Sequence, residues 1–579
     1  MTAKKKPAQK KAFAEYDGAL KTLDQAKQKW VQTGIQERLT ILQDIKDALK
    51  SVADDWVAAA VRHKGIPEGS SLEGEEWFGG PYSMMTSCSG FMQTLSQMQD
   101  KAYLDNLHMR EVATGQTAVR VLPHSTWDHL LMSGVKAEIW MQPGVTADNL
   151  KQHVAKIYDI PVDQRVGKVA LILGAGNVAS IAPLDCFQKL FVEDQVTLLK
   201  MNPVNDYLAE FLEVSLKPLI DRDVLRIVKG DGAVGAYLTD HPLVEEIHVT
   251  GAAATHDAIV WGPGEEGVRN KAKNTPKNTR HVTSELGGVC PTIVVPGPWS
   301  RADIKFQAEN IATQKLNNSG FNCVAFQALI LPRGWNKTDA LMDQIRKFIG
   351  NSRREAYYPG AKVRLDEFAR HSKNAERIER DGTLDFVITN LEDDKDGYYR
   401  TTEVFGPAFS TLELDAPDPE TYLRAAIAYA NDQLEGTLGA NIIIHPTTIW
   451  KIGKITFEKI IAELRYGAIA INTWTGLAYM TAQCPWGAFP GHTKQDIQSG
   501  IGTVHNTMML EQTERSVVQA PWSPFPNNLL FAGDLSLMPK PPWLVGSKNQ
   551  AVMGRLLTDF YHQPNWFKLQ AIMMNAVAA

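Results

Sequence analysis

Cysteine is scarce in this sequence, and no segment stays hydrophobic for long enough to indicate a membrane span. The five cysteines among 579 residues are an odd number with no CxxC pair, which indicates neither a disulfide framework nor a zinc site. The longest charge-free run, residues 466–492, contains Gly, Pro, Asn and Gln, which a bilayer core tolerates poorly. We therefore expect no metal, no membrane span and a reducing compartment, the cytoplasm.

An excess of positive charge is also lacking. The formal net charge of −5 argues against a nucleic-acid-binding protein, which would carry a basic surface and a high pI. The lysines at positions 4–11 are followed by no apolar segment, so they do not form a signal peptide. We interpret residues 1–20 as a flexible, Lys-rich tail. The remaining chain is too long for one hydrophobic core, and two or more domains are expected.

Strands and helices alternate through the middle of the chain. The spacing of apolar residues predicts one or two helices over 20–49, a polar, glycine-rich stretch at 65–82 and a strand pair at 110–123. Short apolar runs then occur at 169–173, 196–200, 224–228 and 246–250, with helical stretches such as 206–219 between them. This pattern predicts a parallel sheet covered by helices, which binds ligands at the carboxyl ends of its strands.

A second α/β region begins near residue 285. It contains a strand at 293–295 and a helix from 302 to about 317, for which Ser300 and Asp303 form a capping box. Residues beyond 520 are rich in proline, with a final helix expected over 561–578. We expect this last segment to pack on the enzyme or a neighbouring subunit, because it carries many large apolar side chains: Trp522, Phe525, Phe531, Trp543, Phe560, Tyr561, Trp566 and Phe567.

Four local motifs carry the chemical information. The stretch Gly174-Ala-Gly-Asn-Val-Ala follows a strand and fits a dinucleotide-binding turn, although a plain tight turn would look the same. The acid that should end the next strand is replaced by Lys200. Three further motifs lie downstream: Glu285-Leu-Gly-Gly, Asn318-Ser-Gly-Phe-Asn-Cys323 and Glu403-Val-Phe-Gly-Pro.

In order and spacing these motifs resemble the aldehyde dehydrogenase superfamily over about residues 20–518. The resemblance implies an α/β fold with a Rossmann-type dinucleotide-binding domain over 21–284, oligomerisation strands near 110–123 and a catalytic domain over 285–500. Residues 501–579 would supply a further oligomerisation strand and a C-terminal extension without a family counterpart, and 261–279 would be an insertion. The resemblance also implies a homodimer or homotetramer formed by strand exchange, for which 110–123 or 516–520 could serve.

The resemblance assigns three catalytic roles. Cys323 would be the nucleophile. A free thiol is only about 3% ionised at pH 7, but its ionised form is strongly nucleophilic. Asn177 would stabilise the oxyanion together with the Cys323 backbone N–H, one such donor being worth about 10²–10³ in rate. Glu285 would activate the water that hydrolyses the thioester. The other four cysteines are interpreted as packing residues.

The cofactor would be NAD or NADP, bound by Gly174, Lys200, Thr250, Gly251, Glu403 and Phe405. The family places an asparagine and a lysine 23 positions apart, as Asn177 and Lys200 are here. An acid usually found three residues after the lysine is replaced by Pro203. Since an acid there would repel a 2′-phosphate, we expect NADP to be accepted.

Departures from the family pattern bear on the substrate. Phe321 replaces a glutamine and Ala328 an arginine of the cysteine motif. Phe321 with Trp474, Tyr479 and Trp486 suggests a bulky, apolar aldehyde, although these rings could equally be core residues. Two alternatives to hydrolytic aldehyde oxidation remain open: a CoA-acylating aldehyde dehydrogenase or acyl-CoA reductase, and a non-catalytic scaffold member. Retention of Glu285 argues against the first, and retention of Cys323, Glu285 and Asn177 against the second.

Overall fold

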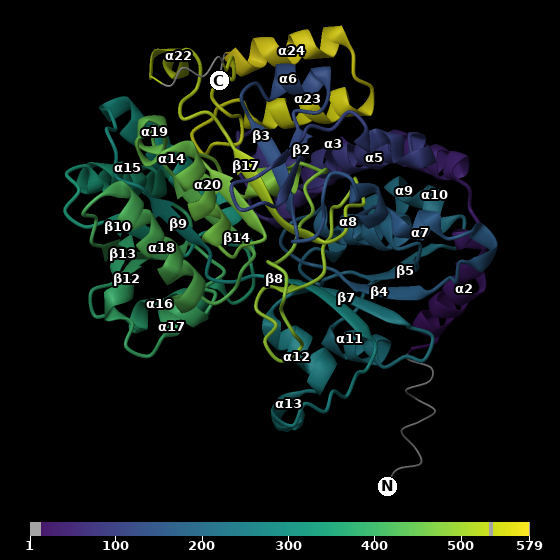
Figure 1. Cartoon of the computed structure of the whole chain (residues 1–579). Coiled ribbons are helices and arrows are strands. Elements are labelled where there is room, and N and C mark those ends of the chain that lie inside the picture. Colours follow the sequence, from purple (N-terminus) through teal and green to yellow (C-terminus); the bar gives the residue numbers. More distant parts are fainter. Residues whose placement is uncertain (1–12, 532–535, 578–579) are drawn as a thin grey trace.

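The computed structural model describes residues 13–531 and 536–577, whose strands form two sheets side by side (Figure 1). The smaller sheet has the order β16-β8-β7-β4-β5-β6, with parallel pairs throughout except at β16. Its strands are β4 Val169–Leu173, β5 Val196–Lys200, β6 Leu225–Val228, β7 Glu246–Gly251, β8 His281–Leu286 and β16 Gly500–Ile501. The apolar runs read from the sequence are therefore the parallel strands of this sheet.

Helices cover both faces of the smaller sheet. They are α2 Ala14–Val31, α3 Ile35–His63, α8 Ile181–Phe187, α9 Ala209–Ser215, α10 Lys217–Ile220, α11 Gly232–Thr239, α12 Ala253–Trp261 and α13 Gly264–Ala272. The helix expected over 206–219 is broken into a 3₁₀ turn, α9 and α10, with Pro218 in the first turn of α10. The alternation of strand and helix gives the expected Rossmann-type arrangement, an α/β fold.

The larger sheet has eleven strands in the order β1-β2-β3-β17-β15-β14-β9-β10-β13-β12-β11. The strands are β1 Met109–Glu111, β2 Thr117–Leu122, β3 Lys136–Met141, β9 Pro291–Val294, β10 Ala328–Pro332, β11 Glu376–Ile378, β12 Phe386–Asn390, β13 Ala408–Leu414, β14 Gly439–Ile443, β15 Ala468–Ile471 and β17 Thr513–Gln519. Within this chain β17 pairs with both β3 and β15, so the strands expected to serve in oligomerisation continue the chain's own sheet.

Two helical layers enclose the larger sheet. On one face α14 Arg301–Leu316 and α15 Thr338–Asn351 bury apolar residues against the strands. On the other face lie α16 Ala361–Arg370, α18 Pro419–Gln433 and α20 Lys454–Glu463, with α17 Tyr398–Thr401 and α19 Pro446–Ile452 nearby. Helix α21 Gly476–Met480 packs with the cluster of the smaller sheet and contacts β15 and β17. The expected capping box is present, since Ser300 Oγ accepts from the Asp303 N–H and Asp303 accepts from the Ser300 N–H.

The N-terminal tail is shorter than expected. Helix α2 begins at Ala14, and Leu20 and Leu23 are fully buried in the core. Residues 14–20 are therefore helical rather than flexible, because this turn of α2 contributes to the apolar face that packs on β4 and β5. Residues 1–12 lie outside the described part of the chain.

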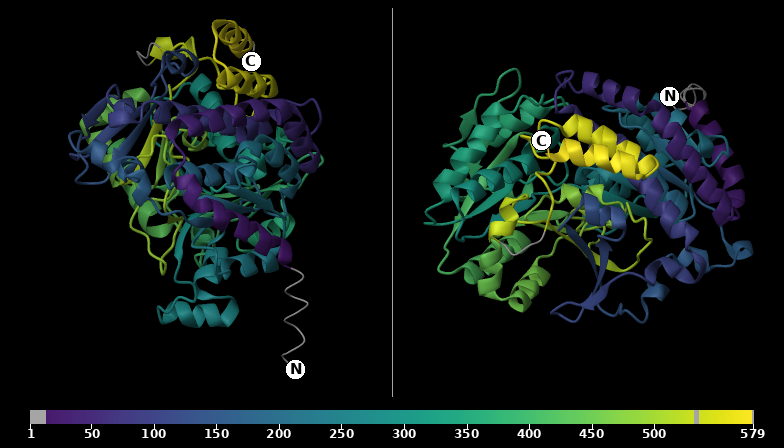
Figure 2. Two further views of the ribbon diagram at one scale, coloured as in Figure 1. Left: turned by 90° about the vertical axis from the view of Figure 1, so that its right-hand side faces the viewer. Right: turned by 90° about the horizontal axis from the view of Figure 1, so that it is seen from above.

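The C-terminal extension folds back onto the molecule, as expected. Helix α23 Gln550–His562 lies against α4 Glu73–Trp77 and α5 Ser83–Ser96, with α24 Trp566–Val577 packed on α23 and α22 Asn527–Phe531 further off (Figures 1 and 2). Trp522, Trp543 and Phe560 are buried. Phe525, Trp566 and Phe567 are exposed, and the side chain of Phe531 lies outside the described part.

The expected last helix is two helices. Gln563 and Pro564 end α23 before α24 begins, because Pro564 cannot donate the next helical hydrogen bond. The smaller elements include α6 Thr126–Leu131, α7 Lys156–Asp159 and a π-helical turn Phe78–Tyr82 between α4 and α5. Within the two described ranges, no helix is both long and apolar enough to cross a membrane.

Candidate active site

Cys323 is presented by a turn of unusual backbone geometry. After α14, the residues Asn318, Ser319 and Gly320 all have positive φ, at 50°, 54° and 79°. A side chain at Gly320 would lie 2.5 Å from the Gly406 carbonyl oxygen, so this turn can approach the 403–407 loop only because residue 320 is a glycine. The turn therefore places Cys323 between the two sheets.

Glu285 lies opposite the thiol, at the carboxyl end of β8. It is 2% exposed, and its Oε1 has no hydrogen-bond partner among the described residues. Burial and then the Asp185 charge raise the pKa of Glu285 to about 7, although the side chains of Cys323 and Trp486 act in the opposite direction. Burial and then Glu285 raise the pKa of the Cys323 thiol well above its ordinary value. The thiol and the carboxylate therefore lie within hydrogen-bonding reach of each other.

Asn177 borders the same cavity as Cys323. Its Nδ2 donates to the Phe321 carbonyl oxygen at 2.9 Å, which leaves the second N–H of the amide without a bond to a described residue. The Cys323 backbone N–H also donates to no described residue. The structure thus brings together Cys323, Glu285 and Asn177, with two donors available beside the thiol.

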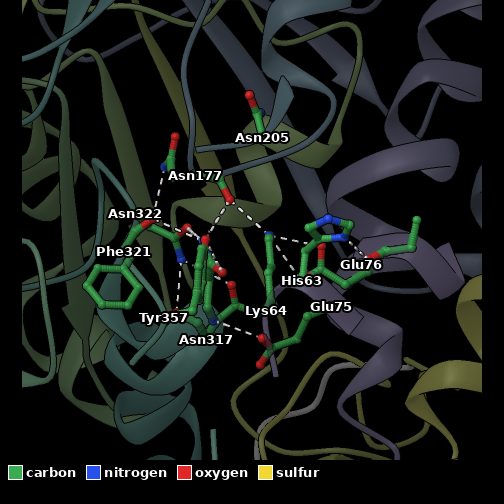
Figure 3. Close-up of polar contacts among 12 residues, drawn as sticks. His63, Lys64, Glu75, Glu76, Asn177, Asn205, Asn317, Phe321, Asn322 and Tyr357 are labelled. Carbon is green, nitrogen blue, oxygen red and sulfur yellow. Dashed lines mark hydrogen bonds and ion pairs between the residues drawn. The ribbon is translucent and has the colours of Figure 1, made fainter. Parts of the chain in front are cut away.

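The Asn177 carbonyl oxygen is held by three donors. Lys64 Nζ and the Tyr357 hydroxyl approach it at 3.0 Å each, and Asn318 Nδ2 approaches it at 3.1 Å (Figure 3). These donors come from α3, from the 352–360 loop and from the cysteine turn. Together they fix the backbone of the first glycine-rich turn relative to Cys323.

A buried ionic network supports this arrangement, and sequence reasoning did not find it. Arg354 donates to Glu75 at 2.8 Å and to Glu76 at 2.9 Å, and Lys64 donates to Glu76 at 3.0 Å. All four side chains are at least nine-tenths buried, and each charge has an opposite partner. Although burial alone would lower it, the Glu76 carboxylate holds the pKa of Lys64 above its ordinary value.

Glu403 lies against Gly287, where any larger residue would collide with it. A Cβ at Gly287 would lie 2.3 Å from Glu403 Oε1. The motif that begins at Glu285 therefore needs a glycine at position 287 for the motif that begins at Glu403 to approach it. Burial raises the pKa of Glu403 to about 8, against the opposing charge of Lys315. Glu403 is partly exposed and lies next to the Glu285–Cys323 pair.

The carboxyl edge of the smaller sheet offers the chemistry that a dinucleotide needs. Lys200, at the end of β5, makes no hydrogen bond or ion pair with a described side chain, and burial lowers its pKa despite Asp231 and Asp206. Helix α12 begins after Ala252 without a side-chain cap, and a Cβ at Gly251 would meet open space. Free N–H groups at a helix start suit a phosphate. These residues fit a nicotinamide dinucleotide.

Thr250 and Gly174 have structural contacts within this edge. The Thr250 hydroxyl donates to buried Asp185 at 2.9 Å, and Asp185 lies 3.5 Å from His248 Nε2. Gly174 packs closely, since a Cβ there would lie 3.0 Å from the Ala182 side chain. Thr250 therefore faces the polar groups behind Glu285, whereas Gly251 faces outward.

Phe321 does not line the cavity at Cys323 and is a core residue, which is the second of the two interpretations that the sequence left open. Its ring is fully buried and packs between Tyr357, Tyr358 and Phe405, at centroid separations of 5.3, 5.4 and 5.7 Å. The other expected rings do line the cavity: Trp474, Tyr479 and Trp486.

The cavity at Cys323 has a volume of about 70 Å³. Besides the aromatic rings it is bounded by Val178, Ile181 and, from the C-terminal extension, Trp543 and Gln550. The extension was expected to pack on the enzyme, but its place in this wall was not foreseen. The described residues contain no group of three or more His, Cys, Asp or Glu side chains that could hold a metal ion.

Comparison with known proteins identifies the family of this chain. A sequence model of the aldehyde dehydrogenase family matches residues 206–510, more than half of the chain, including Glu285, Cys323 and Glu403. Similar solved structures include an aldehyde dehydrogenase from Mycobacterium tuberculosis complexed with NAD⁺, at 18% identity and TM-score 0.58, covering 87% of this chain and 89% of that one. The γ-glutamyl-γ-aminobutyraldehyde dehydrogenase of Burkholderia cenocepacia is 17% identical, with TM-score 0.57 and coverage of 87% and 88%.

Fold and family match together define the class of enzyme. The chain belongs to the aldehyde dehydrogenase family. Asn177 and Lys200 precede the matched segment, so their roles depend on the geometry described above.

Proposed function

We propose that this enzyme oxidises a bulky aldehyde to a carboxylic acid with NAD or NADP, through a covalent thioester on Cys323. The observation that carries the proposal is the juxtaposition of the buried Glu285 carboxylate and the Cys323 thiol beside the Asn177 amide. A nucleophile and an oxyanion donor on one small cavity, with a base in contact with the nucleophile, are what acyl chemistry at a carbonyl requires.

The first step is addition of sulfur to the aldehyde carbon. Glu285 accepts the thiol proton as the Cys323 sulfur attacks, and the carbonyl oxygen becomes an oxyanion. The Asn177 side chain and the Cys323 N–H donate to that oxyanion. The Lys64, Tyr357 and Asn318 contacts hold Asn177 in place for this role.

A nicotinamide cofactor, when bound, would supply the acceptor for the hydride of the aldehyde carbon. Lys200, Gly251 and the start of α12 are proposed to bind its adenosine and pyrophosphate portions, with Gly174 and Thr250 shaping that edge. Glu403 is proposed to bind the nicotinamide ribose, and Phe405 to pack beside it. Glu403 is positioned for this by its approach to Gly287.

Release of the product is proposed to use water. Glu285 first releases the thiol proton to solvent. Ionised again, it takes a proton from a water molecule whose oxygen attacks the thioester, and the C–S bond breaks to release the acid and restore Cys323. A pKa of about 7 suits this role, because Glu285 then exists in both protonation states near neutral pH. Transfer to CoA is the alternative, and it would not need this carboxylate.

The test is a panel of aldehydes with NAD⁺ and NADP⁺, each with and without CoA. Reduction of the cofactor without CoA, with a carboxylic acid as product, is the expected result. Strict dependence on CoA would replace hydrolysis by acyl transfer.

We also propose residues 21–284 as the dinucleotide-binding domain, 285–500 as the catalytic domain, and a homodimer or homotetramer as the assembly.

A further inference from the structure

A second cavity adjoins the one at Cys323, and the C-terminal extension builds much of it. Its volume is about 380 Å³, and Phe78, Met480 and Trp543 line both cavities. The rest of the wall includes Met553 and Leu557 of α23 and Ile572 and Met573 of α24. We call this cavity the outer chamber. Figure 2 shows the two helices lying across the molecule above the α3 and α5 region.

The volumes decide how a substrate can fit. Pockets for drug-sized ligands span roughly 300–1,000 Å³. The cavity at Cys323, at about 70 Å³, has room for an aldehyde group and a short stretch of chain only. A bulky aldehyde therefore fits only if its remaining atoms continue past Phe78, Met480 and Trp543 into the outer chamber.

One charged side chain in this mostly apolar wall has no partner. Lys46, on α3, lines the chamber and is 6% exposed. Among the described residues, none forms a hydrogen bond or ion pair with its amine. The other charged residues of the wall are engaged: Lys540 pairs with Glu309 at 2.6 Å, and Asp128 accepts from the His124 and Ser125 N–H groups.

An ammonium group that is largely withdrawn from water without a partner is unfavourable. Burial accordingly lowers the pKa of Lys46, although the charges of Cys88 and Asp47 act in the opposite direction. A bound carboxylate would supply the missing charge and hydrogen-bond acceptor. The chamber therefore combines an apolar body with one position selective for an anionic group.

We propose that the outer chamber binds the chain of an aldehyde that carries a carboxylate at its far end, with Lys46 pairing to that carboxylate. This inference rests on the proposed function and specifies its substrate class: the half-aldehyde of a long dicarboxylic acid. The aldehyde carbon lies at Cys323, and the methylene chain passes Trp543. No chemical step occurs in the chamber.

The first experiment compares propanal, dodecanal and the semialdehyde of dodecanedioic acid in wild type and Lys46→Met. Methionine keeps the length of the side chain and removes the charge. We expect the variant to lose about 10- to 100-fold in kcat/KM for the semialdehyde, the range for a charged hydrogen bond, mostly through KM. Propanal kinetics should be unchanged and dodecanal should not be impaired.

The matched control is Lys50→Met, one helical turn further along α3. Lys50 pairs with Asp559 and is not part of the chamber wall. Its variant should treat all three aldehydes as wild type does. Equal kcat/KM of Lys46→Met and wild type on the semialdehyde would overturn the role of Lys46.

A second variant tests the chamber itself. Leu557→Trp places a larger side chain into the cavity, whereas Val552→Trp adds the same ring at a half-exposed position on the same helix. We expect Leu557→Trp to raise KM for both long aldehydes without changing propanal turnover, and Val552→Trp to have no such effect. Unchanged kinetics of Leu557→Trp on long aldehydes would overturn the chamber as a chain site.

Binding of the product separates this inference from the proposed function. Calorimetric titration with dodecanedioate requires no turnover, and wild type should bind it at least tenfold more tightly than Lys46→Met. If no aldehyde is oxidised but this difference is found, the proposed function fails and the chamber inference stands. If aldehydes are oxidised but dodecanedioate binds both proteins equally, the chamber inference fails alone.

Discussion

The Glu285 carboxylate acts directly on Cys323, and both its charge and its hydrogen-bonding capacity raise the pKa of the thiol. The thiol is therefore protonated in the resting site and needs a base at the moment of attack. We propose Glu285 as that base, because with a pKa of about 7 it is the member of the pair that is partly ionised near neutral pH. The carboxylate can act a second time once it has released this proton to solvent.

We predict that Cys323 is the essential thiol. Cys323→Ala should fold and bind the dinucleotide but lose dehydrogenase activity, since the covalent intermediate cannot form. Cys88→Ala is the matched control, because Cys88 is fully buried and distant from the motifs in sequence. Activity is measured by cofactor reduction and binding by calorimetry. Ordinary turnover in Cys323→Ala would refute the assignment of the nucleophile.

Asp185 should set the pH dependence of thioester hydrolysis. Its charge opposes ionisation of Glu285, whereas His248 favours it. Hydrolysis needs ionised Glu285, so its rate should rise with pH through about 7 in wild type. Asp185→Asn removes the opposing charge and should lower the pKa of Glu285. The rise of the hydrolysis rate with pH should therefore occur at lower pH than in wild type.

The measurement is the decay rate of the acyl-enzyme across a pH series. Thr283→Val is the control, because it changes a neutral group that contacts His248 at 2.9 Å. An Asp185→Asn profile that coincides with wild type, or moves to higher pH, would contradict the electrostatic argument.

Lys200 should distinguish the two nicotinamide cofactors. Its unpaired amine can attract a 2′-phosphate, and Pro203 provides no repelling acid, although Asp231 and Asp206 lie near enough to act on Lys200. We expect NADP⁺ to bind, and Lys200→Met to weaken NADP⁺ about tenfold more than NAD⁺, the worth of one charge-assisted contact. Dissociation constants for both cofactors test this, and a hundredfold preference of wild type for NAD⁺ would show the argument wrong.

The buried ionic network should matter for stability. Arg354→Met leaves Glu75 and Glu76 short of a partner in the interior, which typically costs about 3–5 kcal/mol. The adjacent Arg353 pairs with Asp381 while 70% of its side chain is exposed, and its replacement by Met should cost less than about 1 kcal/mol. Urea unfolding of both variants compares them, and equal midpoints would contradict the role of Arg354.

The sequence predicts those parts of the molecule that depend on local pattern. Apolar runs between turns identified β4, β5 and β7 because buried parallel strands read as continuous hydrophobic segments. The Ser300 capping box lies within four residues and was equally visible. Cys323, Glu285 and Asn177 were found through motif spacing, and the fold brings all three together.

Features that depend on distant contacts were missed or misassigned. The pairing of Glu75 with Arg354 joins residues 279 positions apart, and the stretch around Glu75 reads as a polar loop. Phe321 occupies a motif position, but packing against Tyr358 and Phe405 decides where its ring points. Trp543 reaches the cavity only through tertiary folding of an extension that has no expected counterpart in the family.

The most direct test of the account is a single-turnover experiment on Glu285→Gln. Glutamine keeps the size of the side chain and removes the base, and a weaker attack can still occur because the oxyanion donors and cofactor site remain. We predict one burst of reduced cofactor, close to one equivalent per active site, followed by turnover slowed by about 10²–10⁴ while the thioester persists on Cys323. Mass spectrometry of the trapped acyl-enzyme identifies that adduct. Full steady-state turnover of Glu285→Gln without CoA, with no adduct on Cys323, would contradict the hydrolytic mechanism.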